Sequence, residues 1–407
     1  MSDEHHSGLL YGLEQRIPPL PAFFSALQHV LAGLVGIITP PLIIGATLGL
    51  GDWLPYLISM SLLASGIGTF LQSNRVWGIG AGMICMQGTS FAFLGVTVAG
   101  GMWVKAQGGG PQDMMAMLFG VNFVAALVPV IVSRFIEPLK KIFTPIITGS
   151  VIALIGISLI KVSVINWCGG EKAEDFASMS NIALGAGTLG VIVLLSCAKN
   201  RWLRLSSVVV GIAVGCIAAG LSGQFHLHSL GDTLFRLPTL FPFGFQFNSA
   251  IFLPVALVSL VCILEAVGDL TANSLISQQS VDDRAFRNRL KGGILADGVS
   301  CMVAAMLCAF PNTTFAQNNG VIQMTGVASR YVGRYIGVIL ILLGLFPPVG
   351  ELLRQIPAPV LGGATMVMFG CVVAAGIRII TQTPLSRRDV LIVGLAFGAG
   401  LGVESVP

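Results

Sequence analysis

Long apolar stretches fill most of the 407-residue chain, and short polar segments separate them. A helix needs about 20 apolar residues to cross a bilayer, so each stretch of that length predicts a membrane span. The predicted spans lie at 22–46, 54–72, 79–100, 113–134, 143–162, 181–198, 206–222, 249–275, 291–309, 316–329, 335–350, 358–380 and 388–403. The pattern therefore predicts an all-α polytopic membrane protein.

Two related polar segments interrupt the apolar pattern. Residues 313–326 read TTFAQNNGVIQMTG, and the TTFA motif at their start has a counterpart in TSFA at 89–92. Lipid offers no hydrogen-bond partners, so polar side chains at membrane depth must face a cavity, an ion or a solute. Related polar segments in the two halves of a membrane protein indicate a binding site between repeats, which is typical of a transporter.

A second pair of matching segments supports an internal repeat. Residues 137–150 resemble residues 351–364, and an odd number of predicted spans separates the matching helices. An odd number inverts the second copy, which predicts two inverted seven-helix repeats with short, broken third and tenth helices. Such a pair needs one helix more than the pattern shows, so we expect the last helix to be missing from this chain. A natural protein with an odd number of helices is the alternative.

Composition agrees with a membrane protein. Only 10% of the residues are charged and the mean hydropathy is +0.87, whereas a soluble domain carries roughly 25% charged residues. Most of the 22 Lys and Arg residues fall in predicted loops on the side of the N-terminus, which predicts a cytoplasmic N-terminus. The 8 Cys residues show no metal-ligand spacing, so we expect neither a metal site nor a cofactor.

Three acidic residues lie inside or beside predicted spans. Glu265 and Asp269 are four positions apart, which places both carboxylates on one helix face. A carboxylate at membrane depth is costly unless it is paired, hydrated or protonated, so we interpret this pair as a solute and proton site. The alternative is a helix end in cytoplasmic water, which suits Asp269 better than Glu265. Asp297 either pairs with Lys291 at the interface or takes part in proton coupling.

The two polar segments add candidate ligands for a solute. If both are half-helices that break at the membrane midplane, their N-termini present free N–H groups. Phe91 follows the polar residues Gln87 and Ser90 and can stack on a planar solute. Gln317 follows Ala316 and offers a donor and an acceptor to a ring edge. Hydrogen bonding between helices is the alternative for these amides.

His29 is the only histidine in an apolar segment. A lone imidazole in a helix bundle is either a packing residue or a ligand. The absence of a second intramembrane histidine argues against a haem held by two axial histidines.

The motifs around these polar residues resemble those of a known family. The chain resembles the nucleobase–ascorbate transporter family of nucleobase–cation symporters, most closely its bacterial xanthine permeases. The family signature is similar to residues 317–325 (QNNGVIQMT), and the next residues, 326–333, are also similar. Two further blocks are residues 265–269 (EAVGD) and 290–298 (LKGGILADG).

The resemblance implies roles for individual residues. Glu265 and Gln317 are expected to bind a purine directly, with Phe91, Ser90 and the Ala316 backbone lining the ring. Asp269 and Asp297 match acids tied to proton coupling, in which Glu265 shares. His29, Gln87 and Asn318 are expected to support the site. The resemblance thus implies three sets of residues: substrate-binding (Glu265, Gln317, Phe91, Ala316, Ser90), proton-coupling (Asp269, Asp297, Glu265) and supporting (His29, Gln87, Asn318).

The resemblance also implies a division into a core domain, which carries the substrate, and a gate domain, which forms a homodimer contact. The expected segments are 1–21 as a cytoplasmic tail, 22–134 as core and 135–222 as gate helices of the first repeat, 223–248 as a periplasmic loop, and 249–350 as core and 351–407 as gate helices of the second repeat.

Two positions refine the expected substrate. Uracil-type members usually carry His at the position of Asp269 and Glu at the position of Gln317, so both residues favour a purine. Some xanthine-specific members carry Asn at the position of Ser90. The smaller serine leaves more room, which favours uric acid as a further substrate.

The predicted function is therefore proton-coupled import of xanthine across the bacterial inner membrane, with an elevator-like motion of core against gate. The expected partners are the purine, protons, membrane lipid and a second copy of the chain, but no nucleic acid. The alternatives are a permease for uracil or another nucleobase, and an uncoupled facilitator or organic-anion exchanger of the same fold. No histidine pair or nucleophile–base pattern supports an enzyme.

Overall fold

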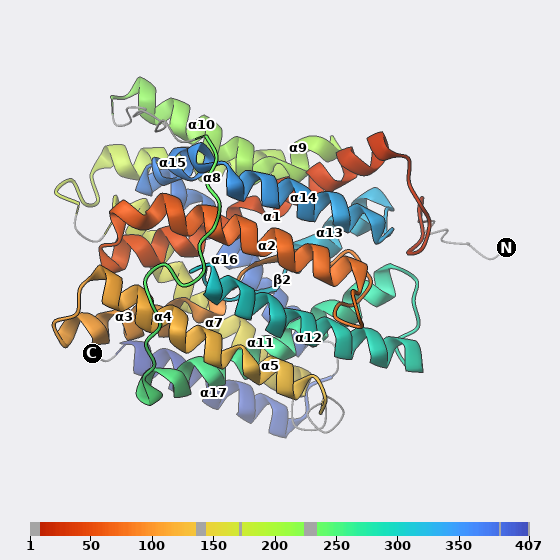
Figure 1. Ribbon diagram of the computed structural model, residues 1–407. Coiled ribbons are helices and arrows are strands. Elements are labelled where there is room, and N and C mark those ends of the chain that lie inside the picture. Colours follow the sequence, from red (N-terminus) through yellow and green to blue (C-terminus); the bar gives the residue numbers. More distant parts are fainter. Residues whose placement is uncertain (1–8, 136–143, 171–172, 224–233, 382–383, 406–407) are drawn as a thin grey trace.

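The computed structural model describes residues 9–135, 144–170, 173–223, 234–381 and 384–405 (Figure 1). The first part of the predicted match at 137–150, residues 137–143, therefore lies outside the described residues. The first half contains α1 (Pro19–Leu48), η1 (Gly51–Trp53), α2 (Leu54–Asn74), β1 (Gln87–Thr89), η2 (Phe91–Phe93), α3 (Leu94–Ala106), α4 (Pro111–Ala125), α5 (Leu127–Val132), α7 (Pro145–Trp167), α8 (Met179–Ser196), α9 (Arg201–Leu205) and α10 (Ser207–Leu221). The second half contains α11 (Ser249–Ile276), α12 (Arg284–Met306), β2 (Asn312–Thr314), α13 (Gln317–Thr325), α14 (Tyr331–Leu345), α15 (Pro347–Arg354), α16 (Ala358–Ile380) and α17 (Arg387–Ser405).

Every predicted span contains a helix, so the all-α architecture is confirmed. Within the described residues, seven helices are long and apolar enough to cross a membrane, or eight if the bent pair α14 and α15 counts as one span. The predicted span at 335–350 is wrong as a continuous helix, because the chain bends by 77° between α14 and α15. Pro347 and Pro348 lie at this bend, and proline lacks the N–H that would continue the helix.

The predicted third helix needs a larger correction, whereas the tenth is the short helix α13 within its predicted range of 316–329. Residues 79–90 are not helical, and the chain turns through Gly80 and Gly82 in left-handed conformations (φ 120° and 69°) before it enters strand β1. The tenth span likewise is preceded by strand β2, so each segment is an extended strand followed by a short helix.

The strands β1 and β2 pair with each other in antiparallel fashion at the centre of the molecule. Gln87 lies opposite Thr314 and Thr89 lies opposite Asn312. The pairing extends by one hydrogen bond at each end: Ser90 N donates to Pro311 O (2.9 Å) and Phe315 N donates to Met86 O (3.0 Å). Extended backbone at membrane depth is tolerated because this pairing satisfies its polar groups.

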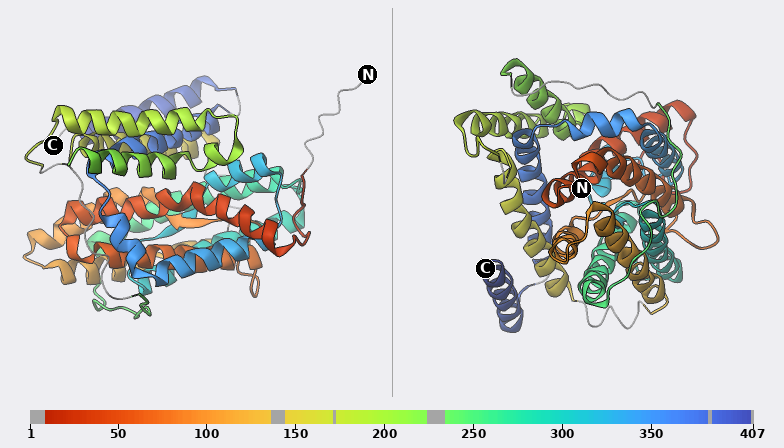
Figure 2. Two further views of the ribbon diagram at one scale, coloured as in Figure 1. Left: turned by 90° about the horizontal axis from the view of Figure 1, so that it is seen from above. Right: turned by 60° about the vertical axis from the view of Figure 1, so that its left-hand side comes forward.

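The helices pack in two layers (Figure 2, left). One layer contains α7, α8, α10, α16 and α17, where α16 packs on both α7 and α8 and α17 packs on α7. The other contains α1 to α5 with α11 to α14, where α2 packs on α14 and α12 packs on α2 and α5.

Close helix crossings within each layer depend on glycine. A Cβ on Gly376 of α16 would lie 2.5 Å from Ala153 N of α7, and one on Gly66 of α2 would lie 2.7 Å from Gly337 O of α14. Small residues at helix crossings allow this approach in membrane proteins. The helices α7 and α16 begin with the matching sequence segments, so the two copies of the repeat pack against each other.

Candidate functional site

A cavity of about 290 Å³ lies between the two layers, at the ends of the central strands. Helix α11, the start of η2 and the start of α13 form one wall, and α7 and α16 form the other. Six residues proposed from the sequence line it: Ser90, Phe91, Glu265, Asp269, Ala316 and Gln317. We call this space the central cavity.

Helix α11 brings both carboxylates to the cavity. Glu265 and Asp269 are one helical turn apart and both are partly exposed, and their exposed surface faces the cavity. The Asp269 carbonyl accepts a hydrogen bond from Asn319 Nδ2 (3.2 Å), which ties α11 to α13. The Asp269 carboxyl lies beside Thr314 of β2. Asp269 therefore lies within α11 rather than at its end, and it borders the central cavity.

The N-terminal end of α13 borders the cavity. Ala316 caps the helix and Gln317 is its first residue, and both side chains are exposed there. The positive end of a helix dipole favours electron-rich groups such as ring carbonyls. The Gln317 amide adds one donor and one acceptor group.

The aromatic side chain in this wall, Phe91, comes from the first half of the chain. Phe91 begins η2, and its ring packs edge-on against Phe369 of α16, with ring centroids 5.1 Å apart and an interplanar angle of 85°. Ser90, just before it, is buried, and its Oγ lies 3.6 Å from Cys262 Sγ of α11.

The opposite wall is apolar. Residues of α7 and α16 form it: Ile152, Ile155, Cys371, Val372, Ala375 and Ile379. The sequence does not reveal these residues as cavity-lining, because it does not distinguish apolar side chains that line a cavity from those that face lipid.

Asp297 lies outside the central cavity, behind the strand pair. Its Oδ1 accepts hydrogen bonds from Gln72 Nε2 (2.8 Å) and Gln87 Nε2 (2.7 Å). Gln72 also donates to Gly293 O (2.9 Å). The described residues contain no ion pair between Asp297 and Lys291, which is exposed. The proposed pairing with Lys291 is therefore replaced by two buried amides, and of these the sequence analysis missed Gln72.

His29 and Asn318 also lie beside the cavity rather than in it. His29 of α1 is fully buried next to Asn318 of α13. Asn318 Nδ2 donates to Ile84 O, which also accepts a hydrogen bond from Asn273 Nδ2 of α11 (2.7 Å). These residues join α1, α11 and α13 around the loop that precedes β1.

Within the described ranges, no three His, Cys, Asp or Glu side chains are grouped closely enough to hold a metal ion. The polar and aromatic side chains that line the cavity offer carboxyls, an amide, hydroxyls and phenyl rings.

Comparisons with known proteins identify the family of this chain. The sequence profile of a family described as the permease family matches residues 21–407. The chain is 44% identical to xanthine permease XanQ of Escherichia coli over 100% of this chain and 89% of the relative. It is 41% identical to xanthine permease XanP of the same bacterium, again over 100% and 89%. It is 33% identical to a uric acid–xanthine permease of Emericella nidulans over 98% of this chain and 75% of the relative.

Solved structures match the fold at low sequence identity. The transmembrane domain of the cyanobacterial bicarbonate transporter BicA superposes with a TM-score of 0.67 at 16% identity, covering 96% of this chain and 98% of that one. The murine anion transporter Slc26a9 in its inward-facing state gives a TM-score of 0.63 at 12% identity, covering 96% and 68%. These matches confirm the predicted inverted-repeat fold. The chain belongs to the permease family that contains these xanthine permeases, the nucleobase–ascorbate transporter family, and it is a membrane transporter rather than an enzyme.

Proposed function

We propose that this protein imports xanthine together with protons, and that uric acid is a second substrate. The observation that carries the proposal is the grouping of Glu265, Asp269, Gln317 and Phe91 around one cavity between the two helix layers. The xanthine permeases and the uric acid–xanthine permease among its relatives support a purine as the substrate.

The cavity offers what a planar purine needs. A purine dione carries N–H and C=O groups along its edges and an apolar face. Glu265 accepts a hydrogen bond from a ring N–H, Gln317 pairs with a carbonyl and the adjacent N–H, and Phe91 packs on the ring face. A site built to hydrogen-bond a substrate rejects analogues that leave its polar groups unpaired.

Proton coupling follows from the acids. A charged carboxyl at membrane depth is costly, so protonation among Glu265, Asp269 and Asp297 lowers the cost of moving the loaded site across the membrane. One proton that moves down a potential of about 100 mV supplies about 2.3 kcal/mol, which corresponds to roughly fiftyfold accumulation.

The two walls of the cavity fit an elevator-like motion. The polar wall belongs to the layer with α11 and α13, which we assign as the core domain, and the apolar wall belongs to α7 and α16 of the gate domain. An apolar wall makes no hydrogen bonds that must break when the core slides past it. We place the protein in the bacterial inner membrane with a cytoplasmic N-terminus, as a dimer joined through its gate domains.

Uptake of radiolabelled xanthine by cells that express the protein tests the proposal. Uptake should collapse with a protonophore, and unlabelled uric acid should compete whereas uracil should not. Saturable xanthine uptake that ignores the protonophore would retain the substrate and reject the coupling. Uptake of uracil in place of xanthine would reject the substrate.

A further inference from the structure

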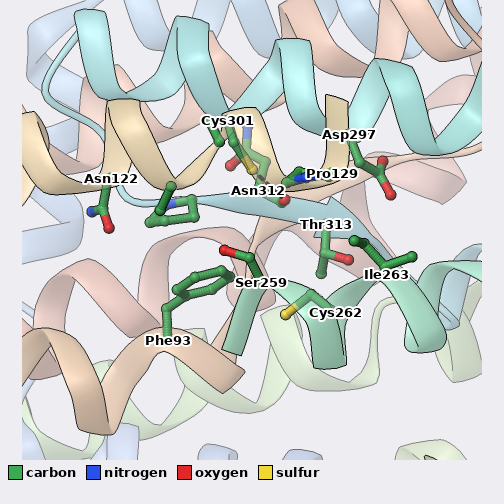
Figure 3. Close-up of a pocket in the computed structure, with 13 residues that line it drawn as sticks. Phe93, Asn122, Pro129, Ser259, Cys262, Ile263, Asp297, Cys301, Asn312 and Thr313 are labelled. Carbon is green, nitrogen blue, oxygen red and sulfur yellow. Dashed lines mark hydrogen bonds between the residues drawn. The ribbon is translucent and has the colours of Figure 1, made fainter. Parts of the chain in front are cut away.

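A second, smaller cavity lies behind strand β2 among α4, α5, α11 and α12 (Figure 3). Its volume is about 20 Å³, and a buried water needs about 10–15 Å³ on the same measure. We call this space the chamber. Asp297 and Asn122 lie at opposite ends of it, and Asn312, Thr313 and Ser259 lie between them.

Several polar atoms around the chamber lack a protein partner. Asn122 Nδ2, Asn312 Oδ1 and Thr313 Oγ1 are buried, and among the described residues none of them has a hydrogen-bond partner. A buried polar atom left without a hydrogen bond costs about 1–3 kcal/mol. A bound water typically makes about three hydrogen bonds and satisfies donors and acceptors alike.

Asp297 lines this chamber and has one carboxyl oxygen without a hydrogen bond from the described residues. Both of its hydrogen bonds, from Gln72 and Gln87, end on Oδ1. The described residues give Oδ2 no hydrogen bond, and Asp297 lines the chamber. Because Oδ1 already accepts two N–H groups, the protonated acid carries its hydrogen on Oδ2, which is then a free donor.

Only a thin wall separates the chamber from the central cavity. Thr313 lines both spaces. A second contact crosses the same wall, since Ser90 lines the central cavity, Cys262 lines the chamber, and their Oγ and Sγ atoms are 3.6 Å apart.

We propose that the chamber binds one water molecule, which together with the Thr313 hydroxyl carries protons between Asp297 and the central cavity. This inference rests on the proposed proton coupling. Asp297 gives the proton on Oδ2 to the water, the water gives one of its own protons to Thr313 Oγ1, and the threonine gives its original proton to a carboxylate in the central cavity. Water and hydroxyl end neutral, and one proton has moved from Asp297 to Glu265 or Asp269. The reverse order returns it.

The test uses the full protein reconstituted in liposomes and compares two rates. Xanthine exchange across the membrane needs no net proton movement, whereas uptake driven by a pH gradient does. Thr313→Val should lower gradient-driven uptake about tenfold or more relative to exchange, because a positioned proton donor contributes at least this much. Thr313→Ser should restore the ratio. Thr97→Val is the matched control, since Thr97 is buried on α3, its hydroxyl has no partner within the described residues and it lines neither cavity.

Three outcomes would overturn the relay: both rates fall in the same proportion, neither rate falls, or the wild-type protein transports xanthine without any dependence on the pH gradient. The last outcome would also reject the proposed coupling. The water site has its own test, an experimental map that resolves ordered water. Water density between Asp297 Oδ2 and Thr313 Oγ1 would support the site, and a wild-type map without this density would overturn it.

Discussion

The two strand–helix segments that meet at the centre of the molecule share a backbone arrangement and carry different chemistry. Each is a short strand, β1 or β2, followed by a helix whose start borders the central cavity (Figure 1). The first segment presents the Phe91 ring to the cavity and directs the Gln87 amide away from it, to Asp297. The second presents the Gln317 amide to the cavity. The repeat thus sets the geometry, and divergence between the copies gives one aromatic wall and one hydrogen-bonding wall.

The first helices of the two repeats differ in the same way. Helix α11 carries Glu265 and Asp269, whereas its counterpart α1 contains no acidic residue and contributes the buried His29. The titratable groups that face the cavity therefore come from the second repeat. A transporter needs its charge on one side of the substrate only, and an acid from each repeat would add repulsion to the cost of burial.

The largest effect should come from removing the Glu265 carboxyl of α11, which has no acidic counterpart on α1. We expect Glu265→Gln to lower xanthine uptake at least about 100-fold, because the variant loses both the charged acceptor for a ring N–H and a proton-binding group. Glu174→Gln, in an exposed loop of the gate layer, is the matched control and should transport normally. Initial uptake rates at equal surface expression measure this, and uptake by Glu265→Gln at the control rate would refute the binding role.

A comparison of the two glutamines should give the next largest effect. Gln317→Leu should raise KM about 10- to 100-fold, because it leaves substrate polar groups unpaired in a desolvated site. Gln87→Leu should lower the maximal rate with little change in KM, since Gln87 contacts Asp297 and not the cavity.

The split between KM and maximal rate is the decisive measurement for this pair. If both variants raise KM equally, the two segments play equivalent roles and the division of labour between them is wrong.

Packing at the strand pair gives a stability prediction. A Cβ on Gly88 of β1 would lie 2.1 Å from the Phe315 ring, and that ring is also held against Gly36, where a Cβ would lie 2.7 Å from it. The ring has no room to move, so Gly88→Ala should destabilise the protein by about 1–3 kcal/mol. Gly95→Ala on α3 meets no atom within 4 Å and should be neutral or slightly stabilising. Thermal unfolding in detergent compares them, and equal midpoints would mean that the strand pair tolerates displacement.

The sequence predicted those parts of the molecule that depend on local periodicity. The helix positions follow from long apolar runs, and the shared face of Glu265 and Asp269 follows from their spacing. The strands β1 and β2 could not be recognised, because three residues are too few to show an alternating pattern and each strand lies in an apolar or polar run that reads as helix.

Contacts between segments that are distant along the chain also could not be predicted from the sequence. Asp297 is bonded to Gln72, which is 225 positions earlier in the chain, and nothing local distinguishes that amide from others at helix ends. The chamber is harder still to foresee, since Asn122 is the one polar residue in the apolar stretch 114–126 and Thr313 acquires its position through the strand pairing.

The smallest expected effect concerns substrate range and sharpens the contrast between the two segments. Ser90 is 3% exposed and lies at the edge of the central cavity beside Cys262. Ser90→Asn adds an amide at a position that lines the cavity, so we expect the larger side chain to take up space there. We expect uric acid to compete several-fold less well, since its extra carbonyl needs the room that serine leaves, while xanthine uptake changes less.

Ser90→Ala is the control and should keep the competition, because it retains the room and removes only the hydroxyl. Competition curves against labelled xanthine measure both variants. Equal loss of competition in Ser90→Asn and Ser90→Ala would mean that the hydroxyl, rather than the space, admits the larger purine, and the first segment would then join the second as a hydrogen-bonding wall.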